Sequence, residues 1–402
     1  MSTETTLGEF EKKITLPEYR TKSYAPDDIP DGLGEYILEN YESEVETEPP
    51  SIKTSGNWEF TNQGYAGRLT TPDDWSIQLE PKVDLQNIFG MMEYAYDLDS
   101  ARFLEGAYDA GSIQEFFDKV VSILAENVIK RSNQGFHKEY IKQEEESQFV
   151  RGKIDIQKTA QKPWKPEAHT KYRELTANIE DNQILLWTLF RTLSSESLSE
   201  GTLNKVRRGV RELQNIAELE EYTANDCVGR EYQRLNSDYE FMHSLCRLIL
   251  DNSGPTRETG EYEMIPFLVE MPTLYERFVA RWFKQNIPAE YRVEPQKSVT
   301  LDERTGLSFD IDIVVYKDDE VVAVADTKYK IPSNPSTDDV SQIISYAERM
   351  DTENAFLVYP QSLSAEFDFT VGDIRIRDLQ FRVDDELERN GRRFRDSILS
   401  AI

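Results

Sequence analysis

The sequence predicts an α+β N-terminal half, β-rich at its start and then helical, followed by an α/β C-terminal domain. Three observations support this fold class. Residues 1–100 contain short strand-like runs between Gly, Pro, Asn and Asp. From about residue 112 to 250, apolar residues recur at the spacings of three and four that are typical of helices. In the last 150 residues, strand-like and helical segments alternate behind an opening helix.

The elements of the N-terminal half follow from these patterns. We expect a strand at 76–80 and a helix across 83–96. Helical periodicity then predicts four further helices, at Ser112–Arg131, Ala177–Leu193, Thr202–Ile216 and Arg230–Leu250. The polar segment 251–260 contains Gly and Pro and ends this pattern. We therefore expect two domains, 1–255 and 256–402, the first β-rich to about 100 and mostly helical over 112–250.

Composition excludes several classes of protein. The 402 residues include 75 Asp and Glu against 46 Lys and Arg, a net charge of −29, while 11% aromatic content excludes a disordered acidic tail. This charge disfavours a nonspecific basic DNA-coating protein and favours a solvated, halophilic surface suited to molar salt. No long apolar run or secretory signal occurs, so we expect a cytoplasmic protein without membrane contact. The two cysteines, Cys227 and Cys246, are expected to be buried thiols.

Two kinds of chemistry are disfavoured by missing motifs. The sequence has neither GxxxxGK[ST] nor GxGxxG, so we do not expect the chain to hydrolyse a nucleoside triphosphate alone. The three histidines, His137, His169 and His243, have no metal-ligand spacing with another His or Cys. Metal chemistry is therefore expected to depend on carboxylates.

The C-terminal domain carries an acidic hairpin. Strands are expected near 307–316 and 321–330, then a helix near 338–350 and a strand near 355–359. With a three-residue loop at 318–320, Asp312 lies opposite Asp326 and Asp310 opposite Lys328. A two-residue loop would put Asp312 and Asp326 on opposite faces, so we expect a loop of odd length.

Ionised groups on one face of an apolar hairpin destabilise the fold unless they are paired or bind a metal. Two carboxylates and a lysine in this arrangement suit Mg²⁺ and phosphate chemistry. Mn²⁺ is the alternative metal. Gln342 and Tyr346 stand four residues apart on one helix face, within reach of a DNA backbone or the metal shell. Glu276 is a candidate third acidic ligand, with a plain salt bridge to Arg277 or a neighbouring turn as the alternative.

These residues resemble a known superfamily. Asp312, Asp326-Thr-Lys328 and Gln342-x-x-x-Tyr346 resemble the PD-(D/E)XK nucleases, and the chain is similar to the McrC family, the nuclease subunit of the McrBC 5-methylcytosine-specific restriction system. Residues 80–95 resemble the family-specific "PK…NLFYML.YA" block, 149–156 its "RGRL" strand and 274–279 its "LFE.FV" helix. The match runs from about 65 to 360. The usual Pro-Asp pair is missing, which leaves Asp310 and Asp312 as alternatives; Asp312-Ile-Val matches the family better.

The resemblance implies a restriction-endonuclease-like C-terminal domain and a division of labour between two proteins. It implies catalytic residues Asp312, Asp326, Lys328, Gln342 and Tyr346, and metal ligands Asp312, Asp326 and Glu276. Residues 1–255 would dock on a hexameric McrB-like AAA+ GTPase and stimulate it, so that GTP acts only through the partner. The substrate would be DNA with modified cytosine, cut in antiviral defence. The alternatives are a stand-alone PD-(D/E)XK nuclease of DNA repair or recombination, and a non-catalytic acidic scaffold.

Overall fold

A computed structural model describes residues 13–71, 75–98, 110–195, 197–254, 257–259, 262–264, 266–302, 304, 306–330, 335–363, 366–384 and 386–402. The chain divides into two compact units, one made of Met1–Phe116 with Asn252–Ile402 and the other of Phe117–Asp251. This division differs from the expected one at residue 255. The reason is that strand β12 (Leu268–Glu270) pairs with β5 (Tyr65–Thr70) and helix α2 (Leu85–Ala95) packs on α9 (Met271–Asn286).

The first part of the discontinuous unit is β-rich, as the sequence predicts. A four-stranded sheet has the order β1-β6-β5-β12, and a three-stranded sheet has the order β2-β4-β3. Their remaining elements are β1 (Lys13–Pro17), β2 (Thr21–Tyr24), a 3₁₀ turn (Pro26–Asp28), α1 (Leu33–Asn40), β3 (Val45–Glu48), β4 (Trp58–Asn62) and β6 (Ser76–Glu80). One apolar core joins the two sheets and α1. The expected helix across 83–96 is α2.

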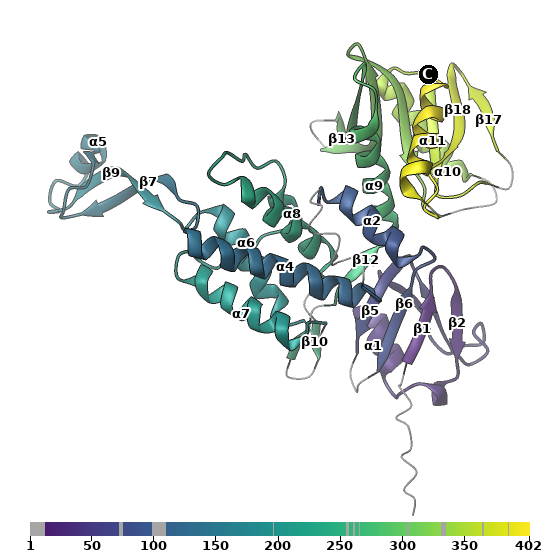
Figure 1. The fold of residues 1–402 in the computed structure, drawn as a ribbon, viewed down its shortest axis with the longest axis horizontal. Helices are drawn as coiled ribbons and strands as arrows, with labels where there is room; N and C mark the ends of the chain where they lie inside the picture. The colour runs from purple at the N-terminus through teal and green to yellow at the C-terminus, as the bar shows by residue number, and fades with distance from the viewer. Residues whose placement is uncertain are drawn as a thin grey trace, which may run out of the picture. The chain divides into compact units, whose positions relative to one another are not determined.

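The second part of this unit is built on a six-stranded mixed sheet (Figure 1). Its order is β13-β14-β15-β16-β18-β17, with β15, β16 and β18 parallel and the other pairs antiparallel. The strands are β13 (Tyr291–Asp302), β14 (Leu307–Lys317), β15 (Glu320–Thr327), β16 (Asn354–Tyr359), β17 (Asp368–Val371) and β18 (Ile374–Gln380). Helices α9, α10 (Thr337–Met350) and α11 (Leu387–Leu399) pack against it. The expected mixture of strands and helices is confirmed here.

The contiguous unit is mostly helical. Its helices are α4 (Ile113–Gln134, whose first turn belongs to the other unit), α6 (Glu180–Thr192), α7 (Glu200–Gln214), a 3₁₀ turn (Ala224–Cys227) and α8 (Ser237–Asn252, which ends one residue beyond the unit). All four helices predicted from periodicity are present, although α8 begins later than expected. Cys227 and Cys246 are buried free thiols, as expected. A separate short pair, β10 (Arg257–Thr259) with β11 (Tyr262–Met264), follows this unit in the chain. In the parts of the chain that the structure describes, no helix combines the length and apolar character needed to cross a membrane.

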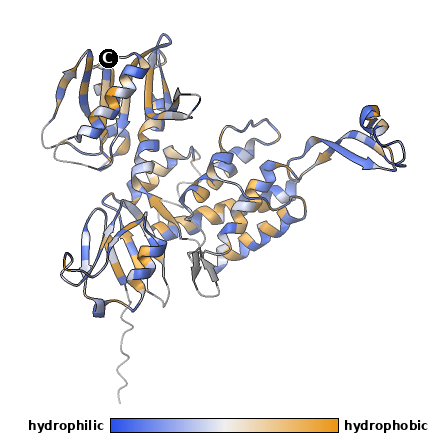
Figure 2. Cartoon of the chain, turned by 180° about the vertical axis from the view of Figure 1, so that it is seen from behind, coloured by the Kyte–Doolittle hydropathy of each residue, from blue (hydrophilic) through white to orange (hydrophobic). Residues whose placement is uncertain are grey.

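A three-stranded ribbon interrupts the helical unit, and helical periodicity did not predict it. Strands β7 (Glu139–Ser147), β8 (Lys153–Ile154) and β9 (Ala168–Thr176) pair in the order β7-β9-β8, with α5 (Ile156–Ala160) between β8 and β9. The ribbon extends away from the helices of its unit and is largely hydrophilic (Figures 1 and 2). Its glutamates pair with lysines, as in Lys158–Glu144 and Lys162–Glu146. The strand expected at 149–156 is confirmed only as the two-residue β8.

Candidate active site

The turn between β14 and β15 sets the position of the acidic residues. Asp318 and Asp319 form a two-residue turn with φ values of 51° and 67°, and Lys317 pairs with Glu320. This combination is typical of a type I′ hairpin. The expected odd-length loop is therefore wrong.

A β-bulge puts Asp312 and Asp326 back on the same face of the hairpin, which the two-residue turn alone would not allow. The register shifts between Val315 and Tyr316, where Val315 pairs with Ala323 but Tyr316 pairs with Val321. Because a bulge opposes two residues to one, the extra residue sits in the strand rather than in the turn. Beyond it Ile313 pairs with Ala325, so the next positions along the two strands are Asp312 and Asp326.

Two carboxylates lie close together at this end of the hairpin. Oδ2 of Asp312 accepts hydrogen bonds from the backbone N–H of Thr327 at 2.7 Å and from its Oγ1 at 2.8 Å. Burial raises the pKa of Asp312 well above its ordinary value, and the charges of Glu276 and Asp326 raise it further. Asp326 is only 3% exposed, and burial raises its pKa while the charge of Lys328 opposes that shift. Two acidic groups therefore lie close together where they are largely shielded from solvent.

Lys328 links the carboxylates to helix α10. Its Nζ lies 2.7 Å from Oδ2 of Asp326 and 3.4 Å from Oδ1 of Asp339, and it donates to Oε1 of Gln342 at 3.1 Å. Gln342 in turn donates from Nε2 to the hydroxyl of Tyr346 at 2.6 Å. The structure therefore brings both candidate helix residues into one chain of contacts with Lys328.

Asp339 also belongs to this group, although it is not among the site residues predicted from the sequence. It accepts from the backbone N–H of Ser336 while Ser336 Oγ accepts from the backbone N–H of Asp339, a capping box at the start of α10. The Ser-x-x-Asp spacing before an apolar helix was the available signal. Because the cap fixes the first turn of α10, it also fixes the position of Asp339 beside Lys328.

The structure places the candidate acids at different distances from Asp326. Asp310 is exposed and pairs with Ser298 in β13, whereas Asp312 lies beside Asp326 and Glu276. Glu276, half-buried on α9, accepts a hydrogen bond from Nε2 of Gln296 at 3.0 Å. Asp312 and Glu276 are therefore the acids that accompany Asp326.

The donor set at this site suits a hard divalent cation. Carboxylate oxygens are the ligands that Mg²⁺ prefers. Oδ2 of Asp326 is a buried oxygen that has the ion pair with Lys328 but no hydrogen-bond donor of good geometry among the described residues. The oxygens of Asp312, Asp326 and Glu276 do not all lie within 4.8 Å of one another, since the one described group that meets this limit lies elsewhere in the chain. The residue types and charges of these three acids therefore fit a metal ion, but some of their oxygens lie further apart than 4.8 Å.

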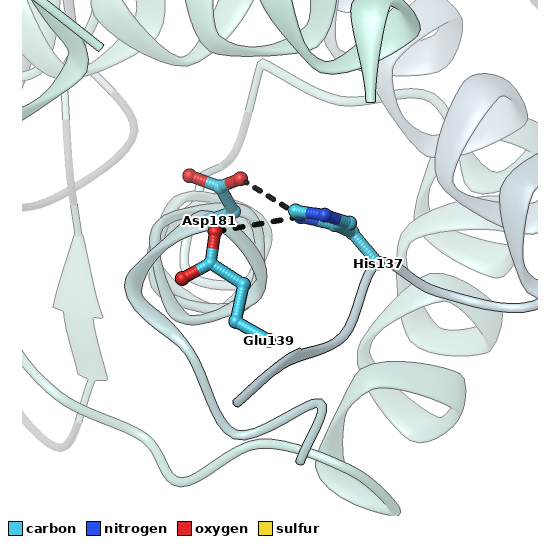
Figure 3. Close-up of side chains that lie close together, drawn as sticks. All are labelled: His137, Glu139 and Asp181. Atoms are coloured by element: carbon cyan, nitrogen blue, oxygen red, sulfur yellow. Dashed lines mark ion pairs between the residues drawn. The ribbon is translucent and has the colours of Figure 1, made fainter. Parts of the chain in front are cut away.

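That other group consists of His137, Glu139 and Asp181 in the helical unit (Figure 3). Nδ1 of His137 lies 3.4 Å from Asp181 and 4.0 Å from Glu139. Sequence spacing did not predict this cluster, because Asp181 is distant along the chain. Arg230 already contacts Oδ1 of Asp181 through Nε at 2.9 Å and Nη2 at 2.7 Å. Asp181 is therefore neutralised by an arginine, and the cluster is explained as an ion-pair network.

Comparison with known proteins decides the family. The profile of the family described as "McrBC 5-methylcytosine restriction system component" matches residues 60–360, which is most of the chain. The chain belongs to this family. The matched span includes both the 80–95 block and the acidic hairpin.

Two relatives of the family can be compared in detail. "Type IV methyl-directed restriction enzyme EcoKMcrBC" of Escherichia coli (strain K12) is 22% identical over 218 residues, which cover 52% of this chain and 61% of that protein. The chain therefore matches less than two thirds of that relative's length. A structure described as a half-complex of Thermococcus gammatolerans McrB AAA+ hexamers with bound McrC matches at 20% identity and a TM-score of 0.53. That match covers 97% of this chain and 100% of the matched chain. At this identity the likeness shows a shared fold.

Proposed function

We propose that this chain is the Mg²⁺-dependent DNA endonuclease subunit of a modification-dependent McrBC-type restriction system. The observation that carries the proposal is the grouping of Asp312, Asp326 and Lys328 at one end of a hairpin, in a chain of the McrBC family. A PD-(D/E)XK nuclease domain accounts for both the residue types and the mixed sheet. Mn²⁺ is an alternative metal.

The chain's own residues have distinct roles in this proposal. Asp312, Asp326 and Glu276 would hold the metal, which when bound would supply positive charge for a phosphate oxygen and for an attacking water. Lys328 provides a fixed positive charge for the phosphate group, whose negative charge increases as water attacks. Gln342 orients Lys328 through the 3.1 Å hydrogen bond, and Tyr346 orients Gln342. The water oxygen forms a bond to phosphorus as the bond to the 3′ or 5′ oxygen breaks, and the leaving oxygen takes up the proton that the water loses, so that one phosphodiester bond is hydrolysed.

A partner motor follows from the same family. The sequence has no P-loop, and the related Thermococcus gammatolerans assembly contains AAA+ McrB hexamers with bound McrC. We therefore assign GTP hydrolysis to an McrB-like hexamer that this chain stimulates, and recognition of methylated cytosine in DNA to the assembly. The charge of −29 leaves little general attraction for DNA, which favours delivery by a partner. The acidic surface also predicts activity at the high salt of a halophilic cytoplasm.

The test is plasmid cleavage at high salt. Methylated and unmethylated plasmids are incubated with the full chain, with and without an McrB-like AAA+ GTPase, Mg²⁺ and GTP. We expect cutting only of methylated DNA and only when partner, Mg²⁺ and GTP are all present. Asp326→Ala should stop cutting while the GTPase rate of the mixture stays stimulated. Mg²⁺-dependent cutting without the partner would favour the stand-alone nuclease, and an inactive complete mixture would refute the endonuclease.

A further inference from the structure

A buried contact connects the N-terminal strands to the residue that follows Lys328. The hydroxyl of Tyr329 donates to Oε2 of Glu18 at 3.2 Å, and the two side chains are 8% and 0% exposed. They are 311 positions apart in sequence but belong to the same compact unit. The same carboxylate oxygen accepts from the backbone N–H of Lys82 at 3.0 Å. Glu18 therefore connects three separate segments of the unit.

The backbone of this region explains why the contact reaches the active site. The N–H of Lys328 donates to the carbonyl of Val358 at 2.8 Å, which continues the parallel pairing of β15 with β16. Successive side chains of extended backbone point to opposite sides, so Lys328 points to the carboxylates while Tyr329 points away from them. A residue that holds the Tyr329 side chain thus limits the rotation of the Lys328 backbone.

The other side of Tyr329 is held by α9. Its ring lies 5.7 Å from the ring of Tyr275, which precedes Glu276 and donates its hydroxyl to the carbonyl of Phe381 at 3.1 Å. Tyr329 is therefore fixed between Glu18 and the helix that carries a candidate metal ligand. A hydrogen bond to a buried carboxylate is stronger than one between neutral groups.

The family-specific block at 80–95 has a place in this arrangement. It supplies the Lys82 N–H that holds Glu18, and Asn87 donates from Nδ2 to the carbonyl of Val383 at 2.9 Å. The block's helix α2 packs on α9, where Tyr94 meets Phe278 with ring centroids 5.8 Å apart. The contacts of Asn87 and Tyr94 join N-terminal residues to the C-terminal part of the unit, whereas the Lys82 contact fixes Glu18 within the N-terminal part.

We infer that Glu18 is a positioning residue for DNA cleavage, which acts through Tyr329 to fix Lys328 against Asp326. The inference rests on the proposed nuclease function. Glu18 is not a catalytic residue, because it touches neither the carboxylates nor Lys328 in the described contacts. A small displacement of a reacting group can cost on the order of 100-fold in rate. Loss of the contact should therefore lower kcat and leave the KM for DNA unchanged.

The variants are Glu18→Ala, Glu18→Gln and Tyr329→Phe in the full chain with its partner. We expect Glu18→Ala and Tyr329→Phe to lower kcat by roughly 10-fold or more, and the double variant to lose no more than the larger single loss. Glu18→Gln keeps an acceptor oxygen and should stay within about twofold of wild type. Glu39→Ala, an exposed glutamate on α1, is the matched control.

Amide hydrogen exchange tests the contact without any cleavage. Exchange at residues 326–330 should accelerate in Glu18→Ala and Tyr329→Phe but not in Glu18→Gln or Glu39→Ala, while melting temperatures show that each variant is folded. An inactive wild type refutes the proposed function, yet accelerated exchange still supports the positioning contact. Unchanged exchange in both loss variants, or unchanged kcat in an active assembly, overturns the inference.

Discussion

Replacement of Lys328 by methionine removes the ammonium and keeps a side chain of similar length. The ammonium lies 2.7 Å from Asp326, and the Lys328 side chain is only 23% exposed, so solvent screens it weakly. At an effective dielectric constant of about 20, a unit charge about 4 Å from a charged phosphate oxygen contributes about 4 kcal/mol. Because about 1.4 kcal/mol corresponds to a factor of ten in rate, Lys328→Met should lower the rate of cleavage by roughly 1,000-fold.

Single-turnover cleavage of methylated plasmid is the appropriate assay, with enzyme, partner, Mg²⁺ and GTP in excess over DNA. Lys330→Met is a matched control, since Lys330 is exposed and lies 4.9 Å over the ring of Tyr19 rather than beside the carboxylates. The control should cleave at the wild-type rate. A Lys328→Met rate within about tenfold of wild type would refute the electrostatic role, because the charge would then contribute less than about 1.4 kcal/mol.

Three further predictions concern stability. Asp326→Asn should abolish cleavage and raise the melting temperature, because burial raises the pKa of this 3% exposed carboxyl and the amide carries no charge; a lower melting temperature would contradict this. Burial lowers the pKa of His243 from 6.5 to about 4. Between these two pH values the imidazole is protonated in the unfolded chain but not in the folded one. The contribution of His243 to stability should fall by about 2 kcal/mol between about pH 7.5 and pH 5, so the difference in urea unfolding free energy between wild type and His243→Gln should change by that amount over this range. Gly391→Ala should lose about 1–3 kcal/mol in urea unfolding, because its Cβ would lie 2.4 Å from Cε2 of Trp282.

The hairpin shows how far residue patterns predict this fold. Alternation within each strand predicts that Asp312 lies beside Asp326, and the pairing of Ile313 with Ala325 puts these two residues at the next positions along the strands. The pattern wrongly placed the extra residue in the loop, because Asp318 and Asp319 both adopt positive φ and close the hairpin in two residues. Either a three-residue loop or a two-residue turn with a bulge gives the same parity. The alternation of side chains therefore predicts which residues share a face, but not whether the extra residue lies in the loop or in a bulge.

Contacts between distant segments are the part of the site that local patterns could not predict. Gln342 and Tyr346 share a helix face, and their hydrogen bond follows from that spacing alone. The partners of Glu18 come instead from residues 82 and 329, and no periodicity relates these positions. The β7–β9 ribbon was missed for a related reason, because its strands are stabilised by lysine–glutamate pairs across the ribbon rather than by an apolar face.

Four carboxylates in the described part of the chain, Asp181, Asp312, Asp326 and Glu18, fall into two physical classes. Asp181 is buried, which raises its pKa, but His243, Arg230 and Asn236 together hold its pKa below the ordinary value. Such a carboxylate is compensated within the protein and needs no ligand. Burial instead raises the pKa of Asp312, Asp326 and Glu18, so ionisation of each of these groups destabilises the folded protein. With 75 acids available for the surface, a buried acid whose partners do not offset the effect of burial on its pKa is explained better by function than by packing. Two of these three acids form the candidate metal site, and the third holds the residue beside Lys328.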